Sequence, residues 1–169
     1  MTCAVALVGL TQVGCTKPAP ARKVASELVP AGTRILASDF TVTDMQSHRI
    51  TLSQYKGKVV LLDFWATTCG GCKVEIPWYV EFDKKYRDEG LALVGIDVAE
   101  ENVANVKPFI AHWQMDYPVA VGSDALAELY RVQELPLTLL IDRTGRIAVS
   151  HAGIIDKAQF ESEIRELLR

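Results

Sequence analysis

Cysteine is scarce in this sequence, and no long run of basic residues is present. Only four of the 169 residues are cysteines, too few for a scaffold held together by disulfides. Cys69 and Cys72 form one C-x-x-C pair, but neither a second pair nor paired histidines complete a zinc site. The 18 Lys and Arg against 21 Asp and Glu leave a net charge of −3, which does not suit nucleic-acid binding. We expect no nucleic-acid partner, no metal and no cofactor.

The remaining composition is that of an ordinary globular protein. Hydrophobic residues make up 49% of the chain and charged residues 23%, which excludes wholesale disorder and collagen-like or coiled-coil architectures. A chain of this length suffices for one domain with a sizeable core and is short for two.

Residues 1–15 have the character of an export leader. They contain no Lys, Arg, Asp or Glu, and their apolar run is too short to span a bilayer. The end of this stretch, Val13 to Cys15, resembles a bacterial lipobox, which would make Cys15 a lipidation site. Gln12 departs from the leucine usual in that motif, and no basic residue precedes the apolar run. The alternative is a mildly apolar terminus of a cytosolic protein.

Residues 16–34 are predicted to be a tether, because a Pro, Ala and basic segment follows Cys15 without periodicity. We expect the folded domain to occupy residues 35–169. Within it, short apolar runs alternate with stretches of helical periodicity, which predicts an α/β fold. The predicted strands are 38–42 and 49–52 (an N-terminal hairpin), 58–65, 91–98, 117–121, 137–141 and 146–150; the predicted helices are 72–89, a segment around Pro108, 124–131 and one capped by Asp156.

Two helices carry particular expectations. In the helix of residues 72–89, Val74, Trp78, Phe82 and Tyr86 recur every four residues and are expected to face the core. Pro108 interrupts the pattern of the next helix, which must either kink or begin at that residue.

The C-x-x-C pair lies where a buried strand meets a helix. Two sulfurs separated by two residues at a helix start can close a disulfide with little backbone movement. The helix N-terminus favours a thiolate at Cys69, and a thiolate is the species that attacks a disulfide. Cys69 is therefore the expected nucleophile, and Cys72 is expected to resolve the mixed disulfide. The alternatives are buried structural thiols or half of a metal site.

The motifs around this pair resemble the thioredoxin superfamily. DFWA at residues 63–66 precedes the cysteines, and Lys73 and Pro77 follow them. The segments LPLTLLID at 135–142 and RTGRI at 143–147 are similar to the TlpA/ResA-like branch, with the likeness covering about residues 36–169. The resemblance implies a thioredoxin-like fold: a central mixed β-sheet flanked by helices, with an N-terminal β-hairpin extension.

The resemblance also implies roles for further residues. Pro136 matches the cis-proline that docks substrate opposite the active-site disulfide; Leu135 precedes it, and Trp65 is expected to line the site. Asp63 stands in an apolar strand, where an uncompensated carboxylate is costly, and it is implied to handle the proton of Cys72. A solvated aspartate at the strand end is the alternative.

Glu75, three residues after Cys72, is a fourth candidate catalytic residue, beside Cys69, Cys72 and Asp63. A carboxylate there would raise the thiol pKa, although an exposed first-turn glutamate is equally ordinary. Gly71, where a proline is common, is expected to leave the loop more flexible. The three histidines, His48, His112 and His151, are expected on the surface or in loops.

The function implied is thiol-disulfide exchange on protein disulfides outside the cytoplasm. The resemblance suggests apocytochrome c among the clients and a DsbD/CcdA-type membrane electron donor. We also expect a lipid anchor at Cys15 and a monomeric protein. A peroxiredoxin-type peroxidase is one alternative, but Ala66 stands where the peroxide-binding threonine is needed. A Sco-like copper chaperone is another, but it would use C-x-x-x-C and a distal histidine.

Overall fold

A computed structural model describes residues 28–99 and 103–169. The predicted leader with Cys15 and most of the predicted tether lie outside the described residues. The described elements, in chain order, are η1 Ala31–Thr33, β1 Thr41–Thr43, β2 Arg49–Thr51, η2 Leu52–Tyr55, β3 Val59–Trp65, α1 Gly70–Tyr86, η3 Arg87–Glu89, β4 Leu91–Asp97, α2 Val103–Trp113, β5 Val119–Val121, α3 Asp124–Leu129, β6 Leu137–Ile141, β7 Ile147–Ala152 and α4 Lys157–Leu168.

The central sheet has five strands in the order β5-β4-β3-β6-β7. β3, β4 and β5 run parallel, because helices connect them, whereas β6 and β7 are antiparallel to their neighbours. The sheet is therefore mixed, as expected. β3 stands in the middle, so that Asp63 is paired with Gly95 on one side and Thr138 on the other.

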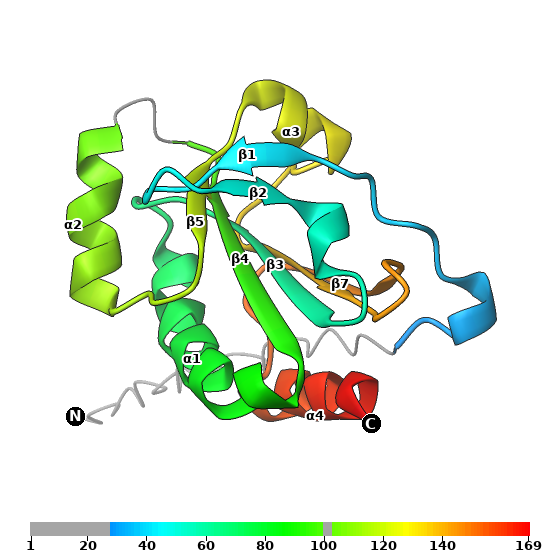
Figure 1. The fold of residues 1–169 in the computed structure, drawn as a ribbon. Coiled ribbons are helices and arrows are strands. Elements are labelled where there is room, and N and C mark those ends of the chain that lie inside the picture. Colours follow the sequence, from blue (N-terminus) through cyan, green and yellow to red (C-terminus); the bar gives the residue numbers. More distant parts are fainter. Residues whose placement is uncertain (1–27, 100–102) are drawn as a thin grey trace, which may run out of the picture.

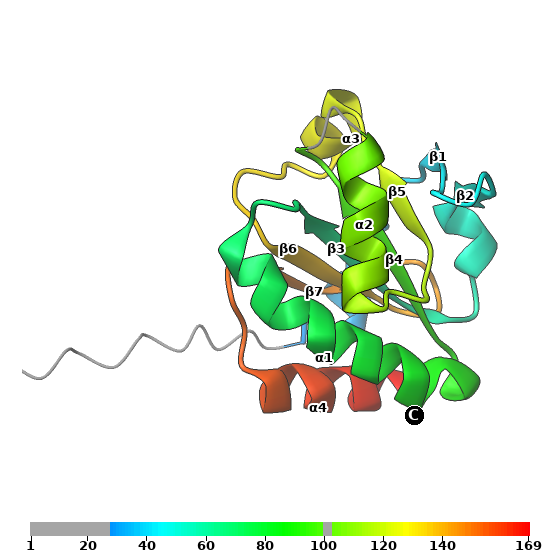
Figure 2. The same ribbon diagram turned by 90° about the vertical axis from the view of Figure 1, so that its left-hand side faces the viewer.

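Two hydrophobic layers enclose this sheet. β3 is buried along its whole length, and its side chains alternate between the layers. Val59, Leu61 and Trp65 belong to the layer built with α1, α2 and α4, whereas the even-numbered residues of β3 face α3, η2 and the hairpin. In Figure 1 the lower end of α1 lies next to α4, and Figure 2 shows the two helices side by side. Asp63 shares the odd-numbered face and thus points toward the α1 layer.

The N-terminal hairpin is confirmed as an antiparallel sheet of β1 and β2. It lies beside β5, where Asp44 and Ala120 form an isolated bridge (Figure 2). Packing begins earlier than residue 35, because Val29 N donates to Ala148 O at 2.9 Å and Arg34 pairs with Asp142 at 3.0 Å. No helix within the described ranges is long and apolar enough to cross a membrane.

The buried face of α1 differs from the predicted stripe. Phe82 and Tyr86 are buried as expected, but Val74 is 44% exposed and Trp78 is only partly buried. The face that α1 presents to the core consists of Cys72, Glu75, Ile76, Tyr79, Phe82, Asp83 and Tyr86. Two of these seven residues carry carboxyl groups, so the core-facing surface of this helix is not purely apolar.

The helix that contains Pro108 could either kink or begin at that residue. α2 begins at Val103 and continues through Pro108 to Trp113. The helix therefore does not start at the proline. Val106 is its buried residue, and Phe109 and Trp113 pack against the same layer as α1.

Candidate active site

The two cysteines of the C-x-x-C pair form a disulfide at the start of α1. Their Cα atoms are 5.3 Å apart. Cys69 is the N-cap of α1, and its Sγ accepts a hydrogen bond of 3.0 Å from Cys72 N. This contact satisfies one of the free N–H groups of the first helical turn and places Sγ at the positive end of the helix. Cys69 is partly exposed, whereas Cys72 is 1% exposed. Of these two described cysteines, Cys69 is therefore the one that can be approached from solvent.

Pro136 faces this disulfide loop, and its peptide bond with Leu135 is cis, which confirms the predicted conformation. A Cβ on Gly71 would stand 3.0 Å from Pro136 Cδ and 3.1 Å from Ile154 Cγ1. Gly71 is thus packed closely between these two side chains, where we expected mainly a gain in loop flexibility. Pro136 is buried, Leu135 is partly buried, and Ile154 is 60% exposed.

Trp65 lies beneath the site. It has no exposed surface, and its ring stacks on Phe109 with centroids 4.9 Å apart. Trp65 therefore offers no surface for a client to touch, which differs from the expectation that it lines the site. Trp65 is buried because it is the last residue of β3, and β3 is covered along its whole length.

Asp63 is 2% exposed, so it is not the solvated strand-end residue that we considered as an alternative. Oδ1 accepts a hydrogen bond of 3.5 Å from the Thr138 hydroxyl, and Oδ2 has no hydrogen-bond partner among the described residues. Burial raises the pKa of Asp63 well above its usual value, and the nearby Glu75 charge adds to the rise, while the bond from Thr138 opposes it. The side chain therefore keeps its proton to a higher pH than an exposed aspartate does.

Glu75 is 1% exposed, so it is not the exposed first-turn glutamate that the sequence left open as an alternative. Oε1 accepts from Ile155 N at 2.9 Å, and Oε2 accepts from the Tyr79 hydroxyl at 2.9 Å. Burial raises the pKa of Glu75, and these two hydrogen bonds together with His151 oppose the rise. Two buried carboxyl groups therefore lie in the layer beneath the disulfide.

His151 is the clearest correction to the sequence analysis. It was expected at the surface or in a loop, but it lies on β7, is 4% exposed and contacts Glu163 Oε2 with Nε2 at 2.9 Å. The predicted strand ends at Ser150, two residues before the end of β7 at Ala152. His48 and His112 are exposed, as expected.

Two hydroxyl groups in the site were also missed. Tyr79, with no exposed surface, lies four residues after Glu75 on α1, and Thr138 lies beside Asp63 in the sheet. The spacing of four residues could have indicated the first of these contacts, because such residues are neighbours on a helix. Across the described parts of the chain, no group of three or more His, Cys, Asp or Glu side chains is arranged to hold a metal ion.

Comparison with known proteins gives one consistent result. Residues 35–150 match the family described as AhpC/TSA. The thiol-disulfide oxidoreductase ResA of Bacillus thuringiensis subsp. konkukian is 33% identical over 132 residues, which cover 78% of this chain and 76% of that protein.

Solved structures agree. A thiol:disulfide interchange protein of the thioredoxin family from Chlorobium tepidum superposes with a TM-score of 0.74 at 26% identity, covering 80% of this chain and 97% of that one. The exposed lipoprotein thioredoxin of Streptococcus pneumoniae gives a TM-score of 0.67 at 28% identity, covering 77% of this chain and 100% of that one.

Proposed function

Because this chain belongs to the AhpC/TSA family and is a ResA-like thiol-disulfide oxidoreductase, we propose that it exchanges protein disulfides outside the cytoplasm through Cys69 and Cys72. The observation that supports separate roles for the two cysteines is their unequal exposure. Cys69 is partly exposed and caps α1, whereas Cys72 is buried directly behind it.

The exchange follows from this geometry. In the reduced protein, the Cys69 thiolate attacks one sulfur of a client disulfide and forms a mixed disulfide, while the other client sulfur leaves as a thiolate. Cys72 then gives up its proton, and its thiolate attacks Cys69 Sγ. This step re-forms the disulfide of the enzyme and releases the second client thiolate. Two electrons pass to the client, and its two thiolates take up two protons.

The neighbouring residues have separate parts in this scheme. Asp63 accepts the proton of Cys72, since its carboxyl group lies buried on the sheet face that α1 covers. Pro136 and Leu135 form the wall against which an extended client segment docks. Glu75 adds a second carboxyl group, whose charge disfavours the Cys72 thiolate.

The cellular setting belongs to the same proposal. Residues 1–15 direct export, Cys15 carries a lipid anchor, residues 16–34 act as a tether and residues 35–169 form a monomeric working domain. The similarity to an exposed lipoprotein thioredoxin supports this arrangement. Clients are exported proteins with cysteine pairs, apocytochrome c among them, and a DsbD/CcdA-type membrane protein returns the electrons.

A trapping experiment tests the chemistry. Cys72→Ser should accumulate mixed disulfides with clients through Cys69, and Cys69→Ser should accumulate none. Clients are released by reductant and identified by mass spectrometry, with the double variant Cys69→Ser/Cys72→Ser as control. Capture by Cys69→Ser alone would reverse the two roles, and capture by neither variant would contradict the proposal.

Localisation is tested separately by fractionating a bacterium that expresses the full chain. The wild-type protein should sediment with membranes, and Cys15→Ser should leave that fraction. An identical distribution of both proteins would remove the lipid anchor from the proposal while leaving the exchange chemistry intact.

A further inference from the structure

Four buried polar groups form an unbroken chain beneath the disulfide. Glu75 Oε2 lies 2.9 Å from the Tyr79 hydroxyl, which lies 2.8 Å from Thr138 Oγ1, which in turn lies 3.5 Å from Asp63 Oδ1. All four side chains are at most 2% exposed. The chain links α1 to β6 and β6 to β3, so it joins the two carboxyl groups of the site across the sheet.

The number of hydrogens available to this row of hydrogen bonds bears on the protonation of Asp63 and Glu75. Three hydrogen bonds need three hydrogens, one for each pair of oxygens. The hydroxyls of Tyr79 and Thr138 supply one each, and ionised carboxylates supply none. If both carboxyls were ionised, Thr138 could donate to Tyr79 or to Asp63 but not to both. Either the 2.8 Å contact between the hydroxyls would lack a hydrogen, or Asp63 would be a buried carboxylate that accepts no hydrogen bond from the described residues.

One additional proton, on Asp63 or on Glu75, supplies the third hydrogen. A proton on Asp63 lets Asp63 donate to Thr138, Thr138 to Tyr79 and Tyr79 to Glu75. A proton on Glu75 lets all three hydrogen bonds run in the opposite direction. The two arrangements interconvert when each donor passes its hydrogen to the next oxygen, and the 3.5 Å contact between Thr138 and Asp63 shortens for that transfer.

We propose that Asp63 and Glu75 share a single proton through the hydroxyls of Tyr79 and Thr138. The oxidised site then holds one carboxylate and one carboxylic acid, and the charge can reside at either end. Tyr79 and Thr138 are positioning residues, since they act through the carboxyl groups.

Groups on the surrounding elements bear on this pair. His151 of β7 faces Glu75 and is itself paired with Glu163 of α4. Tyr117, in the segment before β5, lies close enough to Asp63 for that charge to raise its pKa, an effect second to burial. Burial raises the pKa of both carboxyl groups, in keeping with one retained proton.

The role of the shared proton in catalysis rests on the exchange reaction proposed above. When Cys72 must become a thiolate, the ionised end of the pair accepts its proton, and both carboxyl groups are then protonated. The pair returns one proton to the client thiolate that Cys72 displaces, and it regains its starting state. No electron passes through the pair.

Carboxyl ¹³C NMR titration of the oxidised protein tests the proposal without any client, and Cys69 and Cys72 do not titrate in that state because they form a disulfide. Glu75→Gln should lower the midpoint of Asp63 by about one pH unit, because an amide can supply the missing hydrogen and leave Asp63 ionised. The same substitution in a Tyr79→Phe background should shift Asp63 by less than half as much. Tyr86→Phe is the matched control, since its hydroxyl contacts Glu161 outside the chain, and it should preserve the full shift.

Equal shifts of the Asp63 midpoint in the Tyr79→Phe and wild-type backgrounds would overturn the proposal, because coupling through space alone would explain them. Thr138→Val provides the same test if Tyr79→Phe does not fold, as judged by thermal unfolding. Insulin-disulfide reduction by the wild-type protein is measured in parallel. Failure of that assay would count against the proposed function, whereas the titration result would still decide the sharing of the proton.

Discussion

Pro136 and Gly71 are in close contact across the active-site loop: a Cβ on Gly71 would lie 3.0 Å from Pro136 Cδ. The same Cβ would lie 3.1 Å from Ile154 Cγ1. A Cβ on the preceding glycine, Gly70, would meet nothing within 4 Å. The two residues between the cysteines therefore differ in the space around them, and only the second is confined by the proline.

Gly71→Ala should destabilise the protein by about 1 kcal/mol and slow insulin-disulfide reduction several-fold. Ile154 is exposed and can move aside, but Pro136 is buried and its ring cannot rotate away. Gly70→Ala is the control and should change the free energy of unfolding by no more than about 0.5 kcal/mol. Chemical unfolding and the reductase assay measure both effects. Equal results for the two variants would show that the close contact has no consequence.

The stability of the oxidised protein should depend on Asp63 in a defined pH range. The pKa of Asp63 is raised by burial, so between about pH 4 and that raised value the folded protein keeps a proton that the unfolded chain has lost. The free energy of unfolding should therefore fall as the pH rises through this range, by about 1.4 kcal/mol per pH unit. Asp63→Asn should remove this part of the slope in urea unfolding at a series of pH values.

Asp39 provides the control for that measurement. A hydrogen bond from Ser53 lowers the pKa of Asp39, so its contribution to stability is present above about pH 4 and is lost only as the pH falls through the lowered value. Asp39→Asn should leave the slope above pH 4 unchanged. A wild-type slope that survives in Asp63→Asn would contradict the assignment of the retained proton.

The sequence predicted the parts of the fold that depend on local pattern. The continuous apolar run of β3, the capping aspartate before α4 and the C-x-x-C pair are all visible in neighbouring residues, and all were confirmed. The prediction that Val74 and Trp78 lie on the buried face of α1 was wrong for a geometric reason. Residues spaced by four advance 400°, so a series from Val74 to Tyr86 drifts by about 120° around the helix. The true buried face also includes Glu75, which a search for apolar residues passes over.

The polar partners within the site could not be read from the sequence in the same way. Thr138 is 59 residues from Tyr79 and 75 from Asp63, and only the order of strands in the sheet brings them together. His151 did leave a signal. Val149 and His151 are buried and Ser150 between them is exposed, the alternation of a half-covered strand. Extending the predicted strand by two residues would have turned His151 inward.

His151→Ala should lower the free energy of unfolding by about 2–4 kcal/mol, because Glu163 Oε2 would lose the ring nitrogen that it contacts inside the core. The ring also packs edge-on against Phe160. His48→Ala is the comparison, since His48 contacts Asp44 at 3.2 Å from a side chain that is 69% exposed. It should change stability by at most about 0.5 kcal/mol. If both substitutions had similar small effects on thermal and urea unfolding, the buried pair would have no special role.

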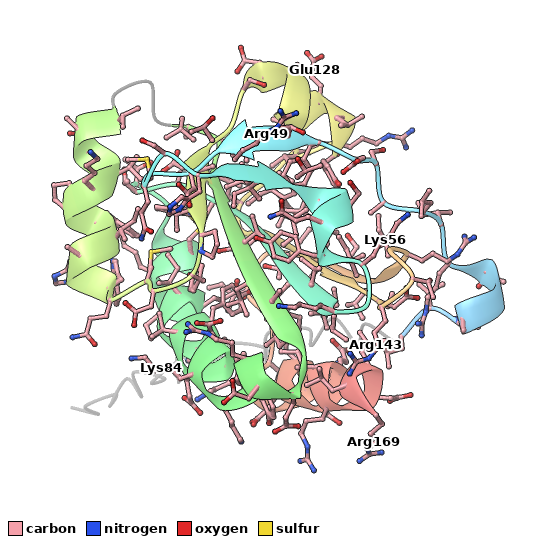
Figure 3. The ribbon with its side chains drawn as sticks, viewed as in Figure 1. Arg49, Lys56, Lys84, Glu128, Arg143 and Arg169 are labelled. Carbon is pink, nitrogen blue, oxygen red and sulfur yellow. A yellow bond between two sulfur atoms is a disulfide. The ribbon has the colours of Figure 1, made fainter. Side chains whose placement is uncertain are left out.

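Arg143 links three segments at the end of the sheet remote from the disulfide. Its guanidinium donates to the carbonyls of Gly57 at 2.8 Å, Glu89 at 3.3 Å and Leu168 at 2.9 Å, and Figure 3 shows it beside the C-terminal end of α4. Arg143→Ala should lower the free energy of unfolding by about 1–2 kcal/mol, and Arg143→Lys should restore little, because an ammonium group lacks the planar fork. The exposed Lys84 on α1 is the control, and Lys84→Ala should change neither stability nor reductase activity. Full recovery with lysine would show that charge alone matters, whereas a loss of reductase activity at unchanged stability would contradict a purely structural role for Arg143.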